Sequence, residues 1–129
     1  MNLPDDLRYT REHEWARRKG ALVVVGVTAF AQEQLGDVVY LELPDVGDVV
    51  KKGESFGVVG STKAVSELFA PISGKVVEVN DPLSDAPETV NDDPYEEGWM
   101  NAIEPSDPRE LEALMDAKAY QAFVDEGEE

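Results

Sequence analysis

The chain has 129 residues, of which 42% are hydrophobic, so its length and composition fit one folded domain with a core and exclude wholesale disorder. Aspartate and glutamate number 28 against 11 lysines and arginines, a formal net charge of −17 at pH 7. This charge repels phosphate backbones and anionic lipids, so we expect no nucleic-acid and no membrane partner. The absence of cysteine rules out disulfides, thiol catalysis and thiolate metal sites.

The first ten residues, MNLPDDLRYT, lack the basic segment and apolar run of a secretory signal. No apolar stretch approaches the ~20 residues that a membrane span needs. We therefore expect a soluble monomer of the bacterial cytoplasm, or of the mitochondrial matrix if the sequence is a mature eukaryotic form.

The first predicted elements are two strands with a helix between them. Residues 21–27, ALVVVGV, form a β-branched run typical of a strand buried on both faces, and residues 38–44 form a second strand. Residues 28–37, TAFAQEQLGD, predict a short helix. Thr28 is expected to cap its first turn, and Gly36 suits the left-handed conformation that ends a helix.

The centre of the chain predicts four more short strands. Residues 46–60 contain two candidates separated by the turn signal Lys52-Gly53. Residues 64–71 and 74–80 are two further candidates. Strands this short, with turns roughly every eight to twelve residues, indicate a mainly β sandwich or barrel and not a parallel α/β sheet.

Residues 81–98 are rich in proline and acidic residues, which predicts a long surface loop. Residues 99–105 are expected to return to the sheets as a strand.

The C-terminal segment is predicted to be helical. Asp107 as cap, Pro108 at the first helical position and Glu110 three residues after the cap form a capping-box pattern. Asp116 is expected to begin a second short helix. Two apolar sets are predicted to face the core: Leu111, Leu114 and Met115 on the first helix, and Ala119, Tyr120 and Phe123 on the second.

Self-contained catalysis has few candidate residues. His13 is the sole histidine, so neither a transition-metal site nor a Ser-His-Asp arrangement has the partners it needs. Residues 91–97, NDDPYEE, carry four carboxylates but lack the ligand spacing and midpoint glycine of an EF-hand, which favours a solvated acidic loop. No glycine cluster leads into a GKS or GKT phosphate loop. We therefore expect a chain that catalyses no reaction alone.

Lys63 is the candidate functional residue. Small residues flank it in the stretch GSTKA, which leaves the ammonium group exposed. The runs FGVV and AVSELFAP on either side can pair as antiparallel strands and fix the turn in space. A lysine amine can be acylated, which removes its charge and converts the side chain into a tether. A solvated surface lysine is the alternative, but the pattern favours a swinging-arm carrier whose attached group supplies the chemistry.

The sequence resembles the H proteins of the glycine cleavage system, which belong to the lipoyl- and biotinyl-carrier domains. The matching segments follow the family's order over most of positions 9–101: YTREHEW (9–15), residues 26–48, KKGESFGVV (51–59), residues 62–80 and VNDDPYEEGWM (90–100). The resemblance implies a barrel-sandwich hybrid of two small antiparallel sheets, with a short helix in the N-terminal half and helices at the end. It implies one lipoyl-carrier domain over 1–129, with a core at about 8–104 and a C-terminal helical segment at about 107–126.

The resemblance also implies that Lys63 carries lipoic acid in amide linkage. Gly47 and Gly74 stand where the family has glycines, and we expect them to set turns that present the hairpin. The sequence departs from the family at Gly60, where the family usually has a glutamate three residues before the modified lysine. Because lipoylating enzymes read shape and charge at the hairpin, this departure bears on the efficiency of attachment.

The implied function is a shuttle for the aminomethyl group of glycine. A pyridoxal-phosphate glycine decarboxylase loads the arm, and an aminomethyltransferase passes the one-carbon unit to tetrahydrofolate. A flavin dihydrolipoamide dehydrogenase then reoxidises the dithiol with NAD as acceptor. These enzymes and the lipoylating enzymes are the implied partners. In the family the loaded arm folds back into a cleft, whose residues the sequence does not assign.

Three other carriers remain as alternatives. Biotin sites usually have methionine on both sides of the lysine, whereas here the neighbours are Thr62 and Ala64. Lipoyl domains of 2-oxo acid dehydrogenases are shorter and precede a linker and a catalytic core, whereas this chain ends in its own helices. The third is an H-like protein that does not serve glycine cleavage and either relays lipoyl groups to other enzymes or acts only as a binding module.

Overall fold

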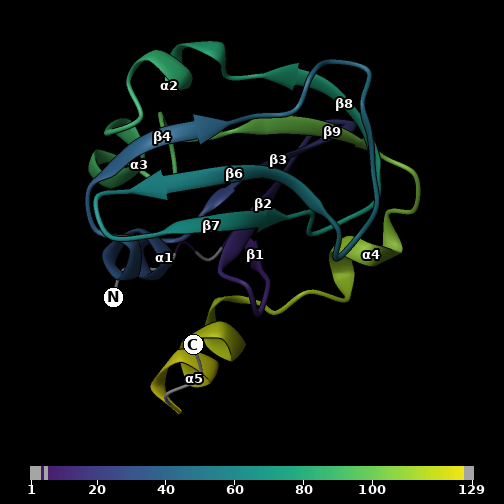
Figure 1. The fold of residues 1–129 in the computed structure, drawn as a ribbon. Helices are drawn as coiled ribbons and strands as arrows, with labels where there is room; N and C mark the ends of the chain where they lie inside the picture. The colour runs from purple at the N-terminus through teal and green to yellow at the C-terminus, as the bar shows by residue number, and fades with distance from the viewer. Residues whose placement is uncertain (1–3, 5, 127–129) are drawn as a thin grey trace.

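The computed structural model describes residues 4 and 6–126, so the opening residues that bear on a secretory signal lie partly outside the described range. Two antiparallel sheets form the body of the structure (Figure 1). The strand order is β1-β2-β3-β9-β8-β5 in the larger sheet and β4-β6-β7 in the smaller. In chain order the elements are β1 Arg8–Tyr9, β2 Glu14–Lys19, β3 Leu22–Val27, α1 Ala29–Leu35, β4 Val38–Glu42, β5 Val49–Val50, β6 Ser55–Ser61, β7 Val65–Phe69, β8 Gly74–Val79, α2 Asp81–Asp85, α3 Thr89–Asp92, β9 Asn101–Pro105, α4 Arg109–Glu112 and α5 Ala117–Asp125.

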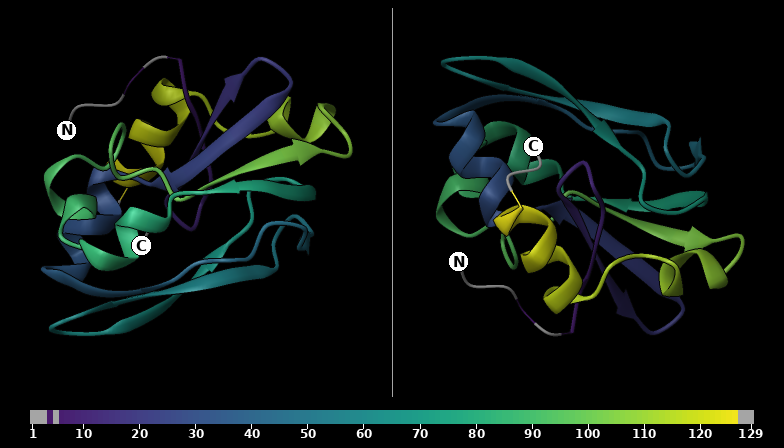
Figure 2. Two further views of the ribbon diagram at one scale, coloured as in Figure 1. Left: turned by 90° about the horizontal axis from the view of Figure 1, so that it is seen from above. Right: turned by 90° about the horizontal axis from the view of Figure 1, so that it is seen from below.

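The main hydrophobic core lies between the two sheets, which face each other in the views of Figure 2. Both sheets contribute fully buried aliphatic side chains, among them Val25, Val59, Val76 and Ile103. Burying this apolar surface is the main favourable term for folding. The prediction of a mainly β barrel-sandwich hybrid with two antiparallel sheets and short helices is confirmed.

The predicted strands and the first helix are confirmed, with small changes at their ends. The Thr28 side chain caps α1 by accepting from the Ala31 N–H at 3.1 Å. Gly36 ends α1 as predicted, but with φ +82° and ψ −152° it adopts an extended conformation open mainly to glycine and not the expected left-handed one. Strands β1 and β2 were not predicted, because charged residues interrupt the apolar pattern of residues 8–19.

The prediction of a surface loop over residues 81–98 is wrong. This segment contains α2 and α3 and contributes Leu83 and Val90 to the main core. Pro82 lies in the first turn of α2, a position where its missing N–H costs no helical hydrogen bond. Two isolated apolar residues in an acidic stretch are a weak local signal, but tertiary contacts bury both of them.

The capping-box prediction for the C-terminal segment is also wrong. Helix α4 begins at Arg109, and the Asp107 carboxylate accepts from the Arg109 N–H at 3.0 Å. The Glu110 side chain turns away from the helix start and accepts from Ser73, at 2.7 Å from the backbone N. Leu111, Leu114 and Met115 were predicted to form one apolar face. Instead, Leu111 and Leu114 pack against the main core, and Met115 packs against a second core.

This second core is largely aromatic, and it is formed where α5 packs against strands β1 and β2 of the larger sheet. Its buried members include Tyr9, Trp15 and Tyr120, and the Tyr9 and Tyr120 rings stack at 4.8 Å. Asp116 caps α5 as predicted, with its side chain accepting from the Ala119 N–H at 2.8 Å. The Ala119 side chain was expected to face inward but is exposed; Ala117 occupies that face with Tyr120.

Helices α1 to α4 lie at the two ends of the sandwich, whereas α5 does not (Figure 1). Helices α1, α2 and α3 gather at one end, where the β6–β7 hairpin also turns, and α4 lies at the opposite end (Figure 1). Within the described residues, the helices are all too short to span a bilayer.

Candidate functional site

The hairpin of β6 and β7 holds Lys63 at its tip. The strands pair antiparallel up to Gly60 and Val65, which confirms the predicted pairing of the two flanking runs. Ser61 closes the turn: its N–H donates to the Ala64 carbonyl at 2.7 Å. Its hydroxyl oxygen accepts from the N–H groups of Lys63 and Ala64, at 3.2 and 3.1 Å. The tip is therefore a defined turn and not a loose loop.

The side chain of Lys63 is exposed and lies across Gly36, at the end of α1. A Cβ atom at position 36 would stand 2.9 Å from Lys63 Cε and 3.6 Å from Nζ. The φ of +82° favours glycine at position 36, whereas the flexible end of the Lys63 side chain would move aside from an added Cβ at little cost.

The hairpin tip is also tied to the turn that joins α1 to β4. The Thr62 N–H donates to the Asp37 carbonyl at 3.1 Å. Through this bond and the contact with Gly36, the α1–β4 turn supports the tip from one side. Sequence reasoning did not identify this support, because nothing local to residues 36–38 indicates a contact with residues 62–63.

A small cleft adjoins this end of the hairpin. It has a volume of about 140 Å³, and its lining includes Gln34 and Leu35, the residues that precede Gly36. Residues of β2, β3, β6, β7 and α1, with the turn before β2, supply the rest of the wall. Three acidic residues, Glu12, Glu14 and Glu67, line the cleft.

Glu14 is the buried member of this acidic set. Its Oε1 accepts from the Thr10 hydroxyl at 2.8 Å and its Oε2 from the Phe69 N–H at 3.3 Å. Burial raises the pKa of the Glu14 carboxyl to about 8, and the two hydrogen bonds offset only part of this effect. Glu14 is therefore mostly protonated at neutral pH. The sequence analysis did not single out Glu14, although it stands within the YTREHEW segment.

His13 is buried and has a positive φ of 71°, which is uncommon for a residue other than glycine. Its Nδ1 lies 2.7 Å from the Tyr120 hydroxyl, which in turn lies 2.8 Å from Thr28 Oγ1. These contacts connect α5 to the start of α1. Within residues 4 and 6–126, no three His, Asp or Glu side chains gather in an arrangement that could hold a metal ion.

The structure places Gly47 and Gly74 away from Lys63. Gly74 begins β8 and pairs with Val50 and Pro105 in the larger sheet. The Gly47 N–H donates to the Val76 carbonyl at 2.8 Å, and Gly47 has φ +100°. Strand β8 begins at the end of the sandwich opposite the hairpin tip (Figure 1). A role of these glycines in presenting the hairpin would therefore act through the sheets.

Gly60 lies next to the tip, on the middle strand of the smaller sheet. Tyr40 and Val65 are its cross-strand neighbours. A Cβ atom at position 60 would stand 3.3 Å from Tyr40 Cβ. A glutamate there would therefore require a small shift of the tyrosine.

Comparisons with known proteins agree with one another. Residues 7–127 match the protein family described as glycine cleavage H-protein. The chain is 82% identical over 128 residues to the glycine cleavage system H protein of Anaeromyxobacter sp. (strain K), covering 99% of this chain and 100% of that protein. It is 65% identical over 123 residues to that of Myxococcus xanthus (strain DK1622), covering 95% of each. A crystal structure of a glycine cleavage system H protein from Mycobacterium marinum is 42% identical, with a TM-score of 0.85 over 97% of this chain and 99% of that one.

Proposed function

Because this chain belongs to the glycine cleavage H-protein family, we propose that it is the lipoyl-carrying shuttle of the glycine cleavage system. In this role it transfers the aminomethyl group of glycine from glycine decarboxylase to aminomethyltransferase. It acts as a non-catalytic carrier. The relatives described above are bacterial proteins, which supports the bacterial cytoplasm as its compartment.

The observation that carries this proposal is the presentation of Lys63. The residue is exposed at the tip of a hairpin that Ser61 closes, and Gly36 leaves room for its side chain. These features fit an amide bond between Nζ and the carboxyl group of lipoic acid, because Nζ is accessible while the backbone beneath it is fixed. The lipoyl group supplies the dithiolane sulfurs that carry the cargo and the electrons.

The cleft beside the hairpin is suited to shelter the end of the arm. Its wall offers a protonated Glu14 at depth and carboxylates of Glu12 and Glu67. The amine of an aminomethyl cargo is positively charged at neutral pH, and a nearby cation lowers the pKa of a carboxyl group. Next to such a cation Glu14 would lose its proton, and its carboxylate would then be placed to hold the ammonium group. The buried position of Glu14 keeps this pair away from bulk water.

The partners follow from the same role. They are a pyridoxal-phosphate glycine decarboxylase, a tetrahydrofolate-dependent aminomethyltransferase, a dihydrolipoamide dehydrogenase and the enzymes that lipoylate Lys63. The net charge of −17 favours docking on basic surfaces of these enzymes.

The test combines mass measurement with reconstitution. Protein isolated from its natural source should show the added mass of one lipoyl group, and Lys63→Arg should lack it. The lipoylated chain should restore glycine decarboxylation when it is added to the three partner enzymes. An unmodified Lys63 in cells supplied with octanoate would contradict the carrier role. A lipoylated chain that restores no turnover would instead indicate a lipoyl relay.

A further inference from the structure

Asn91 makes three hydrogen bonds around the turn that joins α1 to β4. Its Oδ1 accepts from the Val38 N–H at 2.8 Å. Its Nδ2 donates to the Gly36 carbonyl at 2.8 Å and to Gln32 Oε1 at 2.9 Å. One half-buried amide therefore connects the last turn of α1, the residue after the helix and the first residue of β4.

The same turn supports the lysine hairpin. The Asp37 carbonyl lies between the two residues that Asn91 holds, and it accepts the Thr62 N–H. Gly36, whose carbonyl Asn91 binds, is the residue across which the Lys63 side chain lies. A continuous path of hydrogen bonds and contacts thus runs from Asn91 to both the backbone and the side chain of the hairpin tip.

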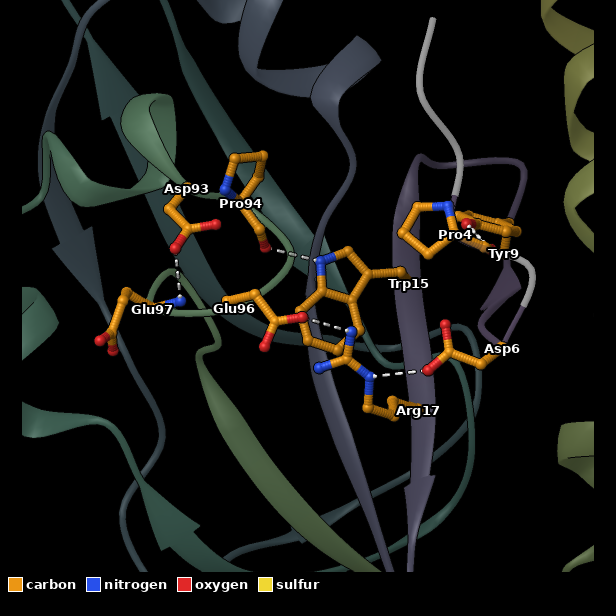
Figure 3. A network of polar contacts seen from close by, with 9 residues as sticks. All are labelled: Pro4, Asp6, Tyr9, Trp15, Arg17, Asp93, Pro94, Glu96 and Glu97. Carbon is orange, nitrogen blue, oxygen red and sulfur yellow. Dashed lines mark hydrogen bonds and ion pairs between the residues drawn. The ribbon is translucent and has the colours of Figure 1, made fainter.

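Asn91 is itself firmly placed. The preceding residue, Val90, is fully buried in the main core. Further along the segment, Trp15 Nε1 on β2 donates to the Pro94 carbonyl at 2.9 Å (Figure 3). The Tyr95 hydroxyl accepts from the Ala29 N–H at 2.9 Å, at the other end of α1. The segment therefore holds α1 at both of its ends.

Arg17 adds a weaker attachment of the same segment to β2. Its guanidinium bridges Glu96 at 3.2 Å and Asp6 at 3.5 Å (Figure 3). Both carboxylates are exposed, so these pairs contribute little on their own. The buried Val90 and the Trp15 bond carry most of the restraint.

We propose that Asn91 is a positioning residue for the acylation of Lys63. This rests on the proposed function of Lys63. Asn91 does not touch the reacting nitrogen. It fixes the Gly36–Val38 turn, and that turn fixes the position of the hairpin tip presented to a modifying enzyme. Without the amide, the turn and the tip sample a wider set of conformations, and fewer encounters place Nζ correctly.

The test compares Asn91→Ala with the matched control Asn80→Ala. Asn80 is also half-buried, stands at the start of the same segment and donates to the carbonyls of Glu97 and Trp99, at 3.0 and 2.7 Å. Its replacement removes two amide hydrogen bonds without touching the Gly36–Val38 turn. The probes are the rate at which a lipoylating enzyme with lipoate and ATP modifies the chain, followed by intact mass, and hydrogen exchange at the Thr62 amide.

We expect Asn91→Ala to slow lipoylation at least about fivefold and to speed Thr62 exchange by a similar factor, as for the loss of one net hydrogen bond. Asn80→Ala should stay within about twofold of the parent on both measures, a change smaller than one such bond. Equal effects of the two variants, or a parent-like Asn91→Ala, would overturn the proposal.

Asn91→Asp serves if the alanine variant does not fold. It keeps the size and the acceptor for the Val38 N–H but loses both donors, so the same slowing is expected. A parent-like Asn91→Asp would overturn the proposal as well. A parent that gains no lipoyl mass overturns the proposed function of Lys63, whereas unchanged Thr62 exchange in the Asn91 variants overturns the positioning role alone.

Discussion

Glu14 shows how one buried group makes the molecule sensitive to pH. Burial raises its pKa from 4.5 to about 8. Between these values the folded chain keeps a proton that the unfolded chain has lost. The free energy of unfolding therefore falls as pH rises through this window, by up to about 1.4 kcal/mol per pH unit from this group.

Replacing Glu14 by glutamine should remove this contribution, because the amide keeps the shape and does not ionise. We expect the difference in unfolding free energy between Glu14→Gln and the parent to grow in favour of the variant from about pH 5 to about pH 8. Urea unfolding at several pH values measures it. Val49→Ala, an exposed site that does not ionise, is the control and should show a constant difference. Parallel curves for Glu14→Gln and the parent would contradict the raised pKa.

For single residues, the sequence correctly predicted those whose contacts lie within a few positions along the chain. Thr28 and Gly36 bound α1 as expected, because a cap depends on the chain within three or four residues of it. Glu110 was misassigned because Ser73, far along the chain, offers its side chain stronger partners than the helix start does. Glu14 and Asn91 could not be assigned, since their contacts join segments that only the tertiary fold brings together.

Among the elements, the segment from Asn80 to Gly98 differs most from its sequence pattern. Acidic and proline residues suggested a solvated loop, whereas α2 and α3 pack on the core and support α1. The strands were easier to predict, because β-branched runs between turn residues recur through the centre of the chain. The hairpin around Lys63 could be predicted in the same way from its two flanking runs. The α1–β4 turn that supports it could not, because their contact joins residues far apart in the sequence.

Leu83→Ala tests whether this segment is part of the core. The side chain is 2% exposed, so its removal should lower the free energy of unfolding by roughly 2–5 kcal/mol. Chemical denaturation measures the loss. Val49→Ala is the control, since that side chain is 74% exposed and should cost no more than about 0.5 kcal/mol. A Leu83→Ala variant as stable as the control would contradict the burial of this segment and favour the solvated loop that the sequence predicted.

The whole molecule carries a net charge of −17, and its self-repulsion opposes the compact state. The ion pairs found within the described part of the chain involve only Arg17 and Arg109, so they neutralise little of it. Most of the negative charge is therefore balanced by solvent ions, and the stability of the fold depends on ionic strength.

Adding salt should accordingly stabilise the protein. Raising ionic strength from about 0.01 M to about 0.15 M shortens the screening length from about 30 Å to about 8 Å. A gain of about 1 kcal/mol would raise Tm by roughly 2–8 °C in calorimetry. Near pH 4.2, where the net charge vanishes, the same salt step should leave Tm nearly unchanged. A Tm that falls with salt at pH 7 would contradict this account.

The support of the lysine hairpin by α3 has a consequence for biosynthesis. A ribosome adds residue 63 before residue 91, so the lysine of a growing chain leaves the exit tunnel before the segment that carries Asn91 has emerged and folded. Any acyltransferase that needs a steady target must then wait for the second half of translation. The chain order thereby favours modification of finished molecules over growing ones.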